Sequence, residues 1–237
     1  MTTRGFVLAV CGLRTEQRLL RATTLRTVAG GGRSAMLAAA IEREVAAGAG
    51  ALVSFGIAGA LAPEFRAGDL LVANGVATPD GDYATDVRWT QALRQGLPAA
   101  HAGTVAGRDV IVADPASKAA LRQASGADAV DMESHIAARI AHAHGLPFVV
   151  LRAVADTATR ALPPAALVAM RDEGGIDLVA VLRSIAMRPG QLAGLLGVAR
   201  DTRAALRSLD RGRRLLGDRL GGGLRDADLD QLPVDVV

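Results

Sequence analysis

Aromatic residues make up only 3% of this 237-residue chain, and cysteine is nearly absent. Half of the residues are apolar, so the core must be built from aliphatic side chains. The scarcity of stacking aromatics argues against a nucleic-acid-binding protein, although the net charge of +3 keeps that class as a remote alternative. The single cysteine, Cys11, excludes an internal disulfide and is typical of a reducing compartment, so we expect a cytoplasmic protein.

Lysine is almost absent too, since Lys118 is the only one. The positive charge is therefore carried by arginine, which suits phosphate or anionic lipid headgroups but also follows from codon bias. The glycine triplet 30–32 lacks the lysine and hydroxyl of a P-loop and the spacing of a dinucleotide fingerprint. We therefore predict a turn at this triplet, and a protein without an organic cofactor.

Charge is missing from residues 45–63, a run of 19 positions that approaches the length of a membrane span. Glycines divide this run into a helix end, a short buried strand at Ala51–Phe55 and a turn, which argues against a spanning helix. The apolar residues 6–13 follow too short a leader for a processing site. We expect no membrane span, and we leave peripheral contact with the inner membrane open.

Two acidic residues end the strands of a predicted strand–helix–strand unit. The unit consists of a strand at Asp128–Met132, a helix at Glu133–His144 and an apolar strand at Pro147–Ala155 that ends at Asp156. Ligands of open α/β sheets bind beyond the carboxyl ends of the strands. A parallel βαβ arrangement would therefore place Glu133 and Asp156 in one crevice, where acids can hold sugar hydroxyls and move a proton.

The rest of the chain alternates strand and helix patterns, which predicts a single α/β domain over residues 1–220 and a flexible tail at 221–237. The polar segment 78–89 is predicted to be a lid or binding loop. Further strands are expected at 5–10, 51–55, 70–76, 102–106 and 109–112, and further helices at 35–47, 115–125, 163–171, 176–187 and 191–220, the last with breaks near Gly197 and Gly217.

Charged stripes on two predicted helices need interpretation. Residues 188–219 hold eight arginines against three aspartates, interspersed with leucines, so this segment either packs on its own domain or lies on anionic lipid. His135, Arg139 and His142 fall on one face of their helix and are predicted to be solvated. A metal site built from these histidines is a remote alternative, because no third ligand is apparent.

Three motifs carry a family resemblance: SFGIAGAL, GDLLVA and AVDMESHIAARIAHAHGLPFVVLRAVAD. Over residues 7–187 the chain resembles the purine nucleoside phosphorylase and methylthioadenosine nucleosidase superfamily. The resemblance implies a nucleoside phosphorylase-like, three-layer α/β/α fold with a central mixed twisted sheet, a helical C-terminal region and a homodimer. It also implies cleavage of the N-glycosidic bond of an adenine nucleoside.

The segments AGGG, VDMESH, LPPAAL and RPGQLAGLL resemble the hopanoid-associated members of that superfamily. This narrower likeness implies release of adenine from lipid-linked adenosylhopane in hopanoid side-chain biosynthesis. A methylthioadenosine or adenosylhomocysteine nucleosidase, or a general purine nucleoside phosphorylase, is the alternative.

The resemblance also implies roles for individual residues. Asp156 would be the general acid that protonates adenine N7, and Glu16 would position the attacking water. Glu133 would bind the ribose hydroxyls and Met132 would pack under the sugar. Asp131, the first acid of the same motif, is assigned to substrate binding as well.

The glycine turn departs from the phosphorylase pattern. Ile57, Ala58 and Gly59 would line the site, but Ser54 and Ile57 stand where phosphorylases carry an arginine and a serine for phosphate. We therefore favour hydrolysis and keep inorganic phosphate as an alternative co-substrate, with Arg14 or Arg18 as its source of charge. The aromatic position that stacks on the base is missing near 114–118, which implies a more aliphatic pocket.

Overall fold

The computed structural model describes residues 5–167, 187 and 189–221. Residues 176–186 of the predicted helix at 176–187, residues 168–171 of the helix at 163–171 and the tail beyond 221 lie outside the described residues. The strands are β1 (Phe6–Cys11), β2 (Arg26–Ala29), β3 (Ala49–Ala60), β4 (Leu70–Thr78), β5 (Gly81–Ala84), β6 (His101–Gly107), β7 (Ala129–Asp131) and β8 (Phe148–Asp156). The helices are α1 (Arg14–Leu19), α2 (Ser34–Ala46), α3 (Val87–Gly96), α4 (Pro115–Ser125), α5 (Ser134–Ala143), α6 (Pro164–Leu167) and α8 (Leu192–Leu216), with 3-10 turns η1 (Pro189–Gln191) and η2 (Gly217–Gly221).

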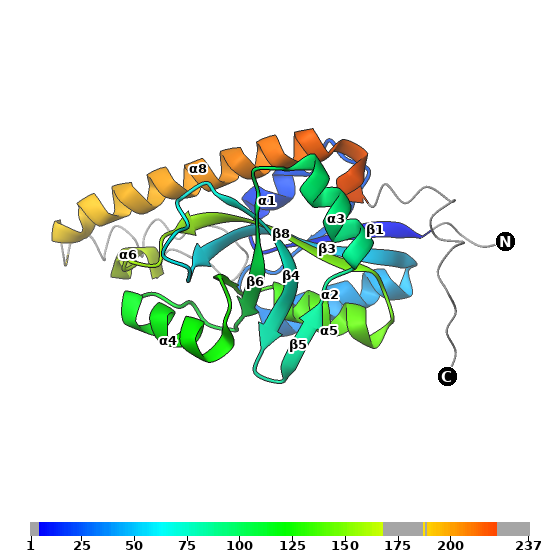
Figure 1. Cartoon of the computed structure of the whole chain (residues 1–237), viewed down its shortest axis with the longest axis horizontal. Coiled ribbons are helices and arrows are strands. Elements are labelled where there is room, and N and C mark those ends of the chain that lie inside the picture. Colours follow the sequence, from blue (N-terminus) through cyan, green and yellow to red (C-terminus); the bar gives the residue numbers. More distant parts are fainter. Residues whose placement is uncertain (1–4, 168–186, 188, 222–237) are drawn as a thin grey trace.

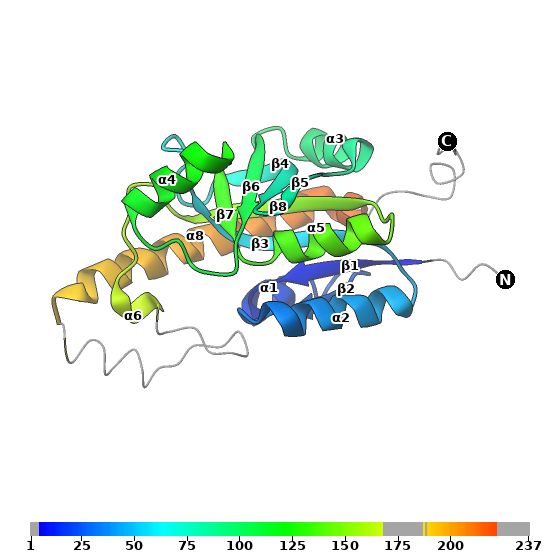
Figure 2. The same cartoon turned by 90° about the horizontal axis from the view of Figure 1, so that it is seen from below.

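A mixed, twisted sheet forms the centre of the molecule (Figures 1 and 2). Its strand order is β2-β1-β3-β7-β6-β4-β5, and β8 pairs with both β3 and β4. The strands β3, β8, β4, β6 and β7 consequently close a ring, because each pairs with the next and β7 returns to β3. The predicted α/β class with a mixed sheet is confirmed.

Helices cover both faces of the sheet. In Figure 1, α1, α3 and α8 lie above it, and α2, α5 and α4 lie below. The core on the α2 and α5 face contains Leu37, Ile41 and Ile136, and the opposite core contains Trp89 and Leu209. This is the expected three-layer arrangement, and the scarcity of aromatics is met by aliphatic packing on both faces.

The uncharged run 45–63 is mostly β3. This strand lies between β1 and β8 and is buried along most of its length, so its apolar composition reflects a central strand. Within the described part of the chain, we find no helix with the length and hydrophobicity needed to span a bilayer.

The parallel βαβ prediction for residues 128–156 is wrong. Although β7, α5 and β8 follow one another in sequence, β7 runs antiparallel to β3 whereas β8 runs parallel to it. The two strands therefore point in opposite directions and do not pair. Both meet β3 at Gly59, which is in register with Val130 of β7 and with Asp156 of β8. The local pattern indicated the elements but not how β3 closes the ring.

Residues 78–89 do not form the predicted lid. They contain the end of β4, the turn to β5 and the start of α3, and Tyr83 pairs with Val76 in an antiparallel hairpin. Trp89 is buried, and its indole N–H donates to the carbonyl of Arg219 at 2.9 Å. The two aromatics of this segment thus pack in the domain.

Three smaller predictions also fail. Residues 109–112 form no strand, and Asp109 instead accepts from Ser34 and contacts His135. His135 is buried rather than solvated, because it packs against Gly107. Helix α8 continues through Gly197 without a break, while the predicted break near Gly217 is confirmed, since α8 ends at Leu216 and Gly217 has a positive φ of 52°.

Candidate active site

Glu16 is held by three backbone amides at the end of β1. Its Oε2 accepts from the amides of Gly12 and Leu13 at 2.9 and 2.8 Å, and its Oε1 accepts from the amide of Ile57 at 2.8 Å. The side chain is only 1% exposed. Three amide donors orient the carboxylate and favour its charged form, although burial still raises its pKa above the usual range.

Arg152 lies beside Glu16, inside the apolar strand β8. Its guanidinium is fully buried and pairs with Asp131 at 2.6 Å, and its Nη2 donates to Ser54 and Ser134 at 2.6 and 3.1 Å. Glu133 Oε2 lies 3.8 Å from Nη2. Three carboxylates, those of Asp131, Glu133 and Glu16, therefore surround one buried arginine.

The fit around Arg152 is close. A Cβ added at Gly56 would lie 2.3 Å from Arg152 Nη1 and 2.8 Å from Glu16 Oε1, so only glycine leaves room for both groups. Arg152 Nη1 is buried and has no hydrogen-bond partner among the described residues. A buried donor without a partner, next to the Glu16 carboxylate, is suited to bind a polar ligand atom or a water.

Glu133 precedes α5 and lies against Gly12. Its Oε1 would be 2.6 Å from a Cβ at that glycine, which places it next to the amides that hold Glu16. Burial raises the pKa of Glu133 to about 8; Arg152 opposes the rise, and Asp131 and Glu16 add to it. For Arg152, burial lowers the pKa, but Asp131, Glu133 and Glu16 outweigh that effect and raise it. Near neutral pH, Glu133 can exchange a proton with its surroundings.

Asp156 lies in a second group of charges, at the end of β8. Its carboxylate is 14% exposed and forms an ion pair with Lys118. Burial raises the pKa of Asp156, as expected for an acid at a dry strand end, while Lys118 and Arg160 oppose the rise. The charge state of Asp156 therefore depends on Lys118.

The strand β3 connects the two groups. The amide of Ile57 binds Glu16, and two residues further along a Cβ at Gly59 would lie 3.1 Å from Asp156 Oδ2. Two strand residues span about 7 Å, which is within the length of a nucleoside. The structure thus brings the predicted acids to one strand end, though in two clusters and not as direct neighbours.

A match to the sequence pattern of the Phosphorylase superfamily covers residues 18–187 of this chain. That is more than half of its length. The chain belongs to the Phosphorylase superfamily.

Relatives of this superfamily member include an aminodeoxyfutalosine nucleosidase from Campylobacter jejuni, which is 32% identical over 132 residues. That alignment covers 47% of this chain and 58% of the relative's length. Among solved structures, a 5'-methylthioadenosine/S-adenosyl homocysteine nucleosidase from Helicobacter pylori matches with a TM-score of 0.62 at 16% identity, covering 89% of this chain and 98% of the other. A corresponding nucleosidase from Neisseria meningitidis matches with a TM-score of 0.58 at 20% identity, covering 87% and 98%. At these identities, the solved structures show a common fold.

The remaining predicted site residues of this superfamily member lie around β3 and β7. Met132 and Ile57 are half-buried, whereas Ala58 is buried in the α2 and α5 core, which leaves its backbone as the part that can face a ligand. Asp131 is 5% exposed and is already bound by Arg152 and Ser134. Its position supports an indirect role, in which it orients Arg152.

Sequence reasoning missed Arg152, Ser134 and Lys118. An arginine within the apolar run FVVLRAVAD was a usable signal, because a charge inside a buried strand requires partners. Lys118 gave no local signal beyond being the only lysine. Within the described ranges, no group of three or more His, Cys, Asp or Glu side chains is arranged so that it could hold a metal ion.

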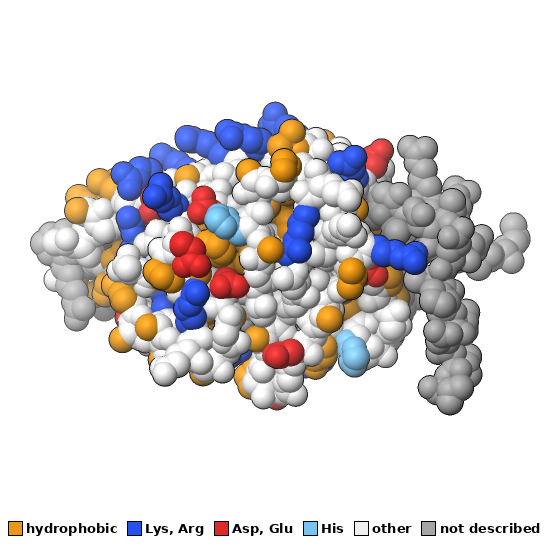
Figure 3. Space-filling model, viewed as in Figure 1, with side chains coloured by type: hydrophobic (Ala, Val, Ile, Leu, Met, Phe, Trp, Pro, Cys, Tyr) orange, Lys and Arg blue, Asp and Glu red, His pale blue; other side chains and the backbone are white. Residues whose placement is uncertain are grey.

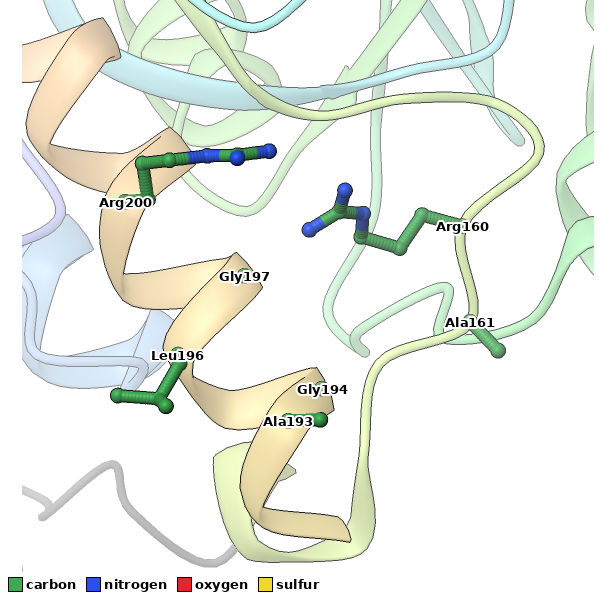
Figure 4. Close-up of a pocket in the computed structure, with 7 residues that line it drawn as sticks. All are labelled: Arg160, Ala161, Ala193, Gly194, Leu196, Gly197 and Arg200. Carbon is green, nitrogen blue, oxygen red and sulfur yellow. The ribbon is translucent and has the colours of Figure 1, made fainter.

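A groove of about 560 Å³ adjoins the Asp156 cluster (Figure 4). It lies between α8 and the segment after β8. Arg160 and Arg200 point toward one another across it, and Leu196 points away. Arg160 links this groove to the site, since its guanidinium pairs with Asp201 at 2.9 Å and its carbonyl accepts from Lys118 at 3.2 Å. The lining residues are Arg160, Ala161, Ala193, Gly194, Leu196, Gly197 and Arg200.

Proposed function

We propose that this protein cleaves the N-glycosidic bond of an adenine nucleoside by hydrolysis. The observation that carries the proposal is the pair of acids that contact β3 from α1 and β8, with Glu16 bound to the amide of Ile57 and Asp156 packed against Gly59. Burial raises the pKa of both acids, but Glu16 is the one of the two that three backbone amides orient and favour in its charged form. This division suits one group that directs water and one that donates a proton.

The proposed reaction needs an acid at the base and a nucleophile at the sugar. As the C1'–N9 bond breaks, its electron pair moves onto adenine and the sugar gains oxocarbenium character. Asp156 donates its proton to adenine N7, so that neutral adenine leaves. A water near Glu16 and Arg152 Nη1 attacks C1', and Glu16 accepts its proton. Glu133, whose pKa is about 8, exchanges hydrogen bonds with the ribose hydroxyls beside Arg152.

Water is favoured over phosphate because of the charges around Arg152. Ser54 is occupied by Arg152 and Ser134, and Ile57 offers an apolar side chain and an amide that is already bound to Glu16. A phosphate dianion would approach Glu16 and Glu133 directly. We therefore propose that the reaction needs neither a cofactor nor phosphate, and we expect equal rates of adenine release with and without phosphate. Strict phosphate dependence with a ribosyl phosphate product would show that the nucleophile is assigned wrongly.

We propose adenosylhopane as the substrate, with a methylthioadenosine or adenosylhomocysteine nucleoside as the second candidate. The groove beside Asp156 supports a nucleoside with a large substituent, because four of its seven lining residues are alanine or glycine. The second candidate is supported by the shared fold with two 5'-methylthioadenosine/S-adenosylhomocysteine nucleosidases. The deciding assay measures adenine release from adenosylhopane in vesicles and from soluble methylthioadenosine under the same conditions. A kcat/KM that favours the soluble nucleoside would select the second candidate.

A lipid-linked substrate requires contact with a membrane at the cytoplasmic surface, and α8 supplies a suitable face. Arg203, Arg207, Arg211 and Arg214 are exposed at helical spacing, and Leu192 and Leu196 extend the same face. Figure 3 shows basic side chains in a row over α8. Some leucines of the predicted apolar face do not belong to this exposed face, because Leu209 and Leu216 pack in the core. We propose reversible binding of this face to anionic lipid.

Vesicle flotation tests this binding. Each arginine near an anionic surface contributes about 1 kcal/mol, so the double variant Arg207→Gln and Arg211→Gln should weaken binding by about 30-fold at low salt. The matched control changes the exposed Arg43 and Arg88 to Gln, which removes the same charge elsewhere. An equal loss in both variants, or no flotation of the parent protein at any salt, would contradict docking through α8.

We also propose a homodimer. Met36 is 57% exposed and Val110 is 69% exposed. They lie beside the contact that joins Ser34 of α2 to Asp109. An apolar surface next to the site is typical of a subunit contact. Light scattering should give a dimer that weakens in Val110→Asp, and a monomeric parent protein would refute the proposal.

A further inference from the structure

Lys118 is the only lysine in the chain, and its side chain is fully buried. It projects from α4 toward the end of β8. Its Nζ forms an ion pair with Asp156 Oδ2 and donates to the carbonyls of Thr157 and Arg160 at 2.8 and 3.2 Å. An ammonium group has three N–H donors, so these three acceptors satisfy it completely.

Core packing does not explain a lysine at this position. Removing an ammonium from water costs several kcal/mol, and an apolar side chain of similar length often gives equal or greater stability. The neighbouring Leu121 packs α4 onto the small cluster around Leu61 and Ala106 without any charge. We therefore look for the role of this charge among the groups that it contacts. Of the three acceptors of Lys118, two are backbone carbonyls and one is the side chain of the candidate acid Asp156.

We propose that Lys118 is a positioning residue that makes Asp156 an effective proton donor. The inference rests on the proposed nucleosidase function. When Asp156 gives its proton to adenine N7, the O–H bond breaks, the N7–H bond forms, and a carboxylate remains in a poorly hydrated place. The fixed ammonium balances this new charge without moving, so it stabilises the transition state more than the ground state. The same ion pair fixes the direction of the carboxyl group.

The other charges that face Asp156 come from two elements. Arg160 follows β8 and lowers the pKa of Asp156, whereas Asp201 of α8 raises it. Arg160 and Asp201 pair with each other at 2.9 Å, so their effects on Asp156 largely offset. Burial raises the pKa of Asp156 and Lys118 is the largest opposing influence. Loss of Lys118 should therefore leave Asp156 protonated to a higher pH but a weaker acid.

The test compares pH profiles of adenine release from methylthioadenosine or adenosylhopane, whichever the parent enzyme cleaves. In Lys118→Met, we expect the alkaline limb of kcat/KM to move up by at least about one pH unit, while kcat on the plateau falls at least about tenfold. Leu121→Met is the matched control, since it changes packing on the same helix without changing charge. A fall in activity with an unmoved limb would mean that Lys118 is merely structural, and would overturn the proposal.

A double-mutant cycle distinguishes this inference from the proposed function. In an Asp156→Asn background, Lys118→Met should cost less than about twofold, because its effect passes through Asp156. Full activity of Asp156→Asn would refute the assignment of the acid itself. If Asp156→Asn is inactive but the two changes act independently, the proposed function stands and the role of Lys118 is refuted.

NMR of the unaltered protein gives a readout that needs no folded Lys118 variant. Because the chain has one lysine, labelling with lysine carrying ¹³C at Cε yields one side-chain signal. We expect this signal to shift as Asp156 titrates and to lose that shift in Asp156→Asn. A signal that is unaffected by Asp156 would overturn the inference.

Discussion

The raised pKa of Glu133 predicts that the folded protein loses stability as the pH rises. In the unfolded chain, Glu133 ionises near pH 4.5, but burial beside Asp131 and Glu16 raises its pKa to about 8 in the folded state. Between these values the folded state keeps a proton that the unfolded state has released. One such proton gives a slope of about 1.4 kcal/mol per pH unit, so unfolding should become easier by about 3 kcal/mol between pH 5 and pH 7.

Urea denaturation at pH 5, 6 and 7 measures this slope in the parent protein and in Glu133→Gln. The neutral amide keeps the shape of the side chain but removes its titration. The slope of the unfolding free energy against pH should therefore be smaller in Glu133→Gln by about 1.4 kcal/mol per pH unit. Glu64→Gln is the matched control, because the Glu64 side chain is 59% exposed. Equal slopes in the parent protein and Glu133→Gln would show that Glu133 is already ionised in the folded state.

Three further predictions concern the groups around Glu133 and Asp156. Arg152→Met should lower the free energy of unfolding by about 3–5 kcal/mol, because it leaves Asp131 buried without its cation; a change below about 1 kcal/mol in urea denaturation would contradict this. Asp156→Asn should reduce turnover at least about 100-fold with an unchanged circular dichroism spectrum, and near-parental turnover would refute its role as the acid. Gly56→Ala should displace Arg152 and reduce activity at least about tenfold, whereas Gly50→Ala, whose Cβ would meet Gly5 at an ordinary 3.5 Å, should not; equal activities would mean that the Arg152 side chain adapts.

Sequence patterns located the two acids of the site because apolar strands end at them. The run from Phe148 ends at Asp156, and the short strand β7 ends just before Glu133. Burial in a central sheet makes such strands largely apolar, so acids that follow an apolar run indicate where the strand ends. The same reasoning located α4, where Pro115 lies in the first turn and Gly126 adopts a left-handed conformation after the last.

Long-range pairing could not be obtained in this way. Glu16 is bound by an amide 41 residues away, and Lys118 reaches Asp156 across 38 residues. Neither contact leaves a trace in local periodicity. The direction of β7 was also mispredicted, since strand–helix–strand patterns suggest parallel pairing and β3 here extends far enough to separate β7 from β8. His135 was mistaken for a surface residue because helix spacing cannot show that Gly107, which has no side chain, leaves room for His135 against β6.

The separation of the acids along β3 places them among different sets of charges. Glu16 shares Arg152 with Glu133, so a change of charge on one of them is felt by the other. Asp156 faces a different set of charges, those of Lys118, Arg160 and Asp201. In the proposed reaction, proton donation at the base and activation of water at the sugar can therefore be controlled separately, although the two acids contact one strand only two residues apart, Glu16 at Ile57 and Asp156 at Gly59. Cleavage of a glycosidic bond needs that independence, because the acid must be protonated in the same complex in which the water-directing carboxylate is ionised.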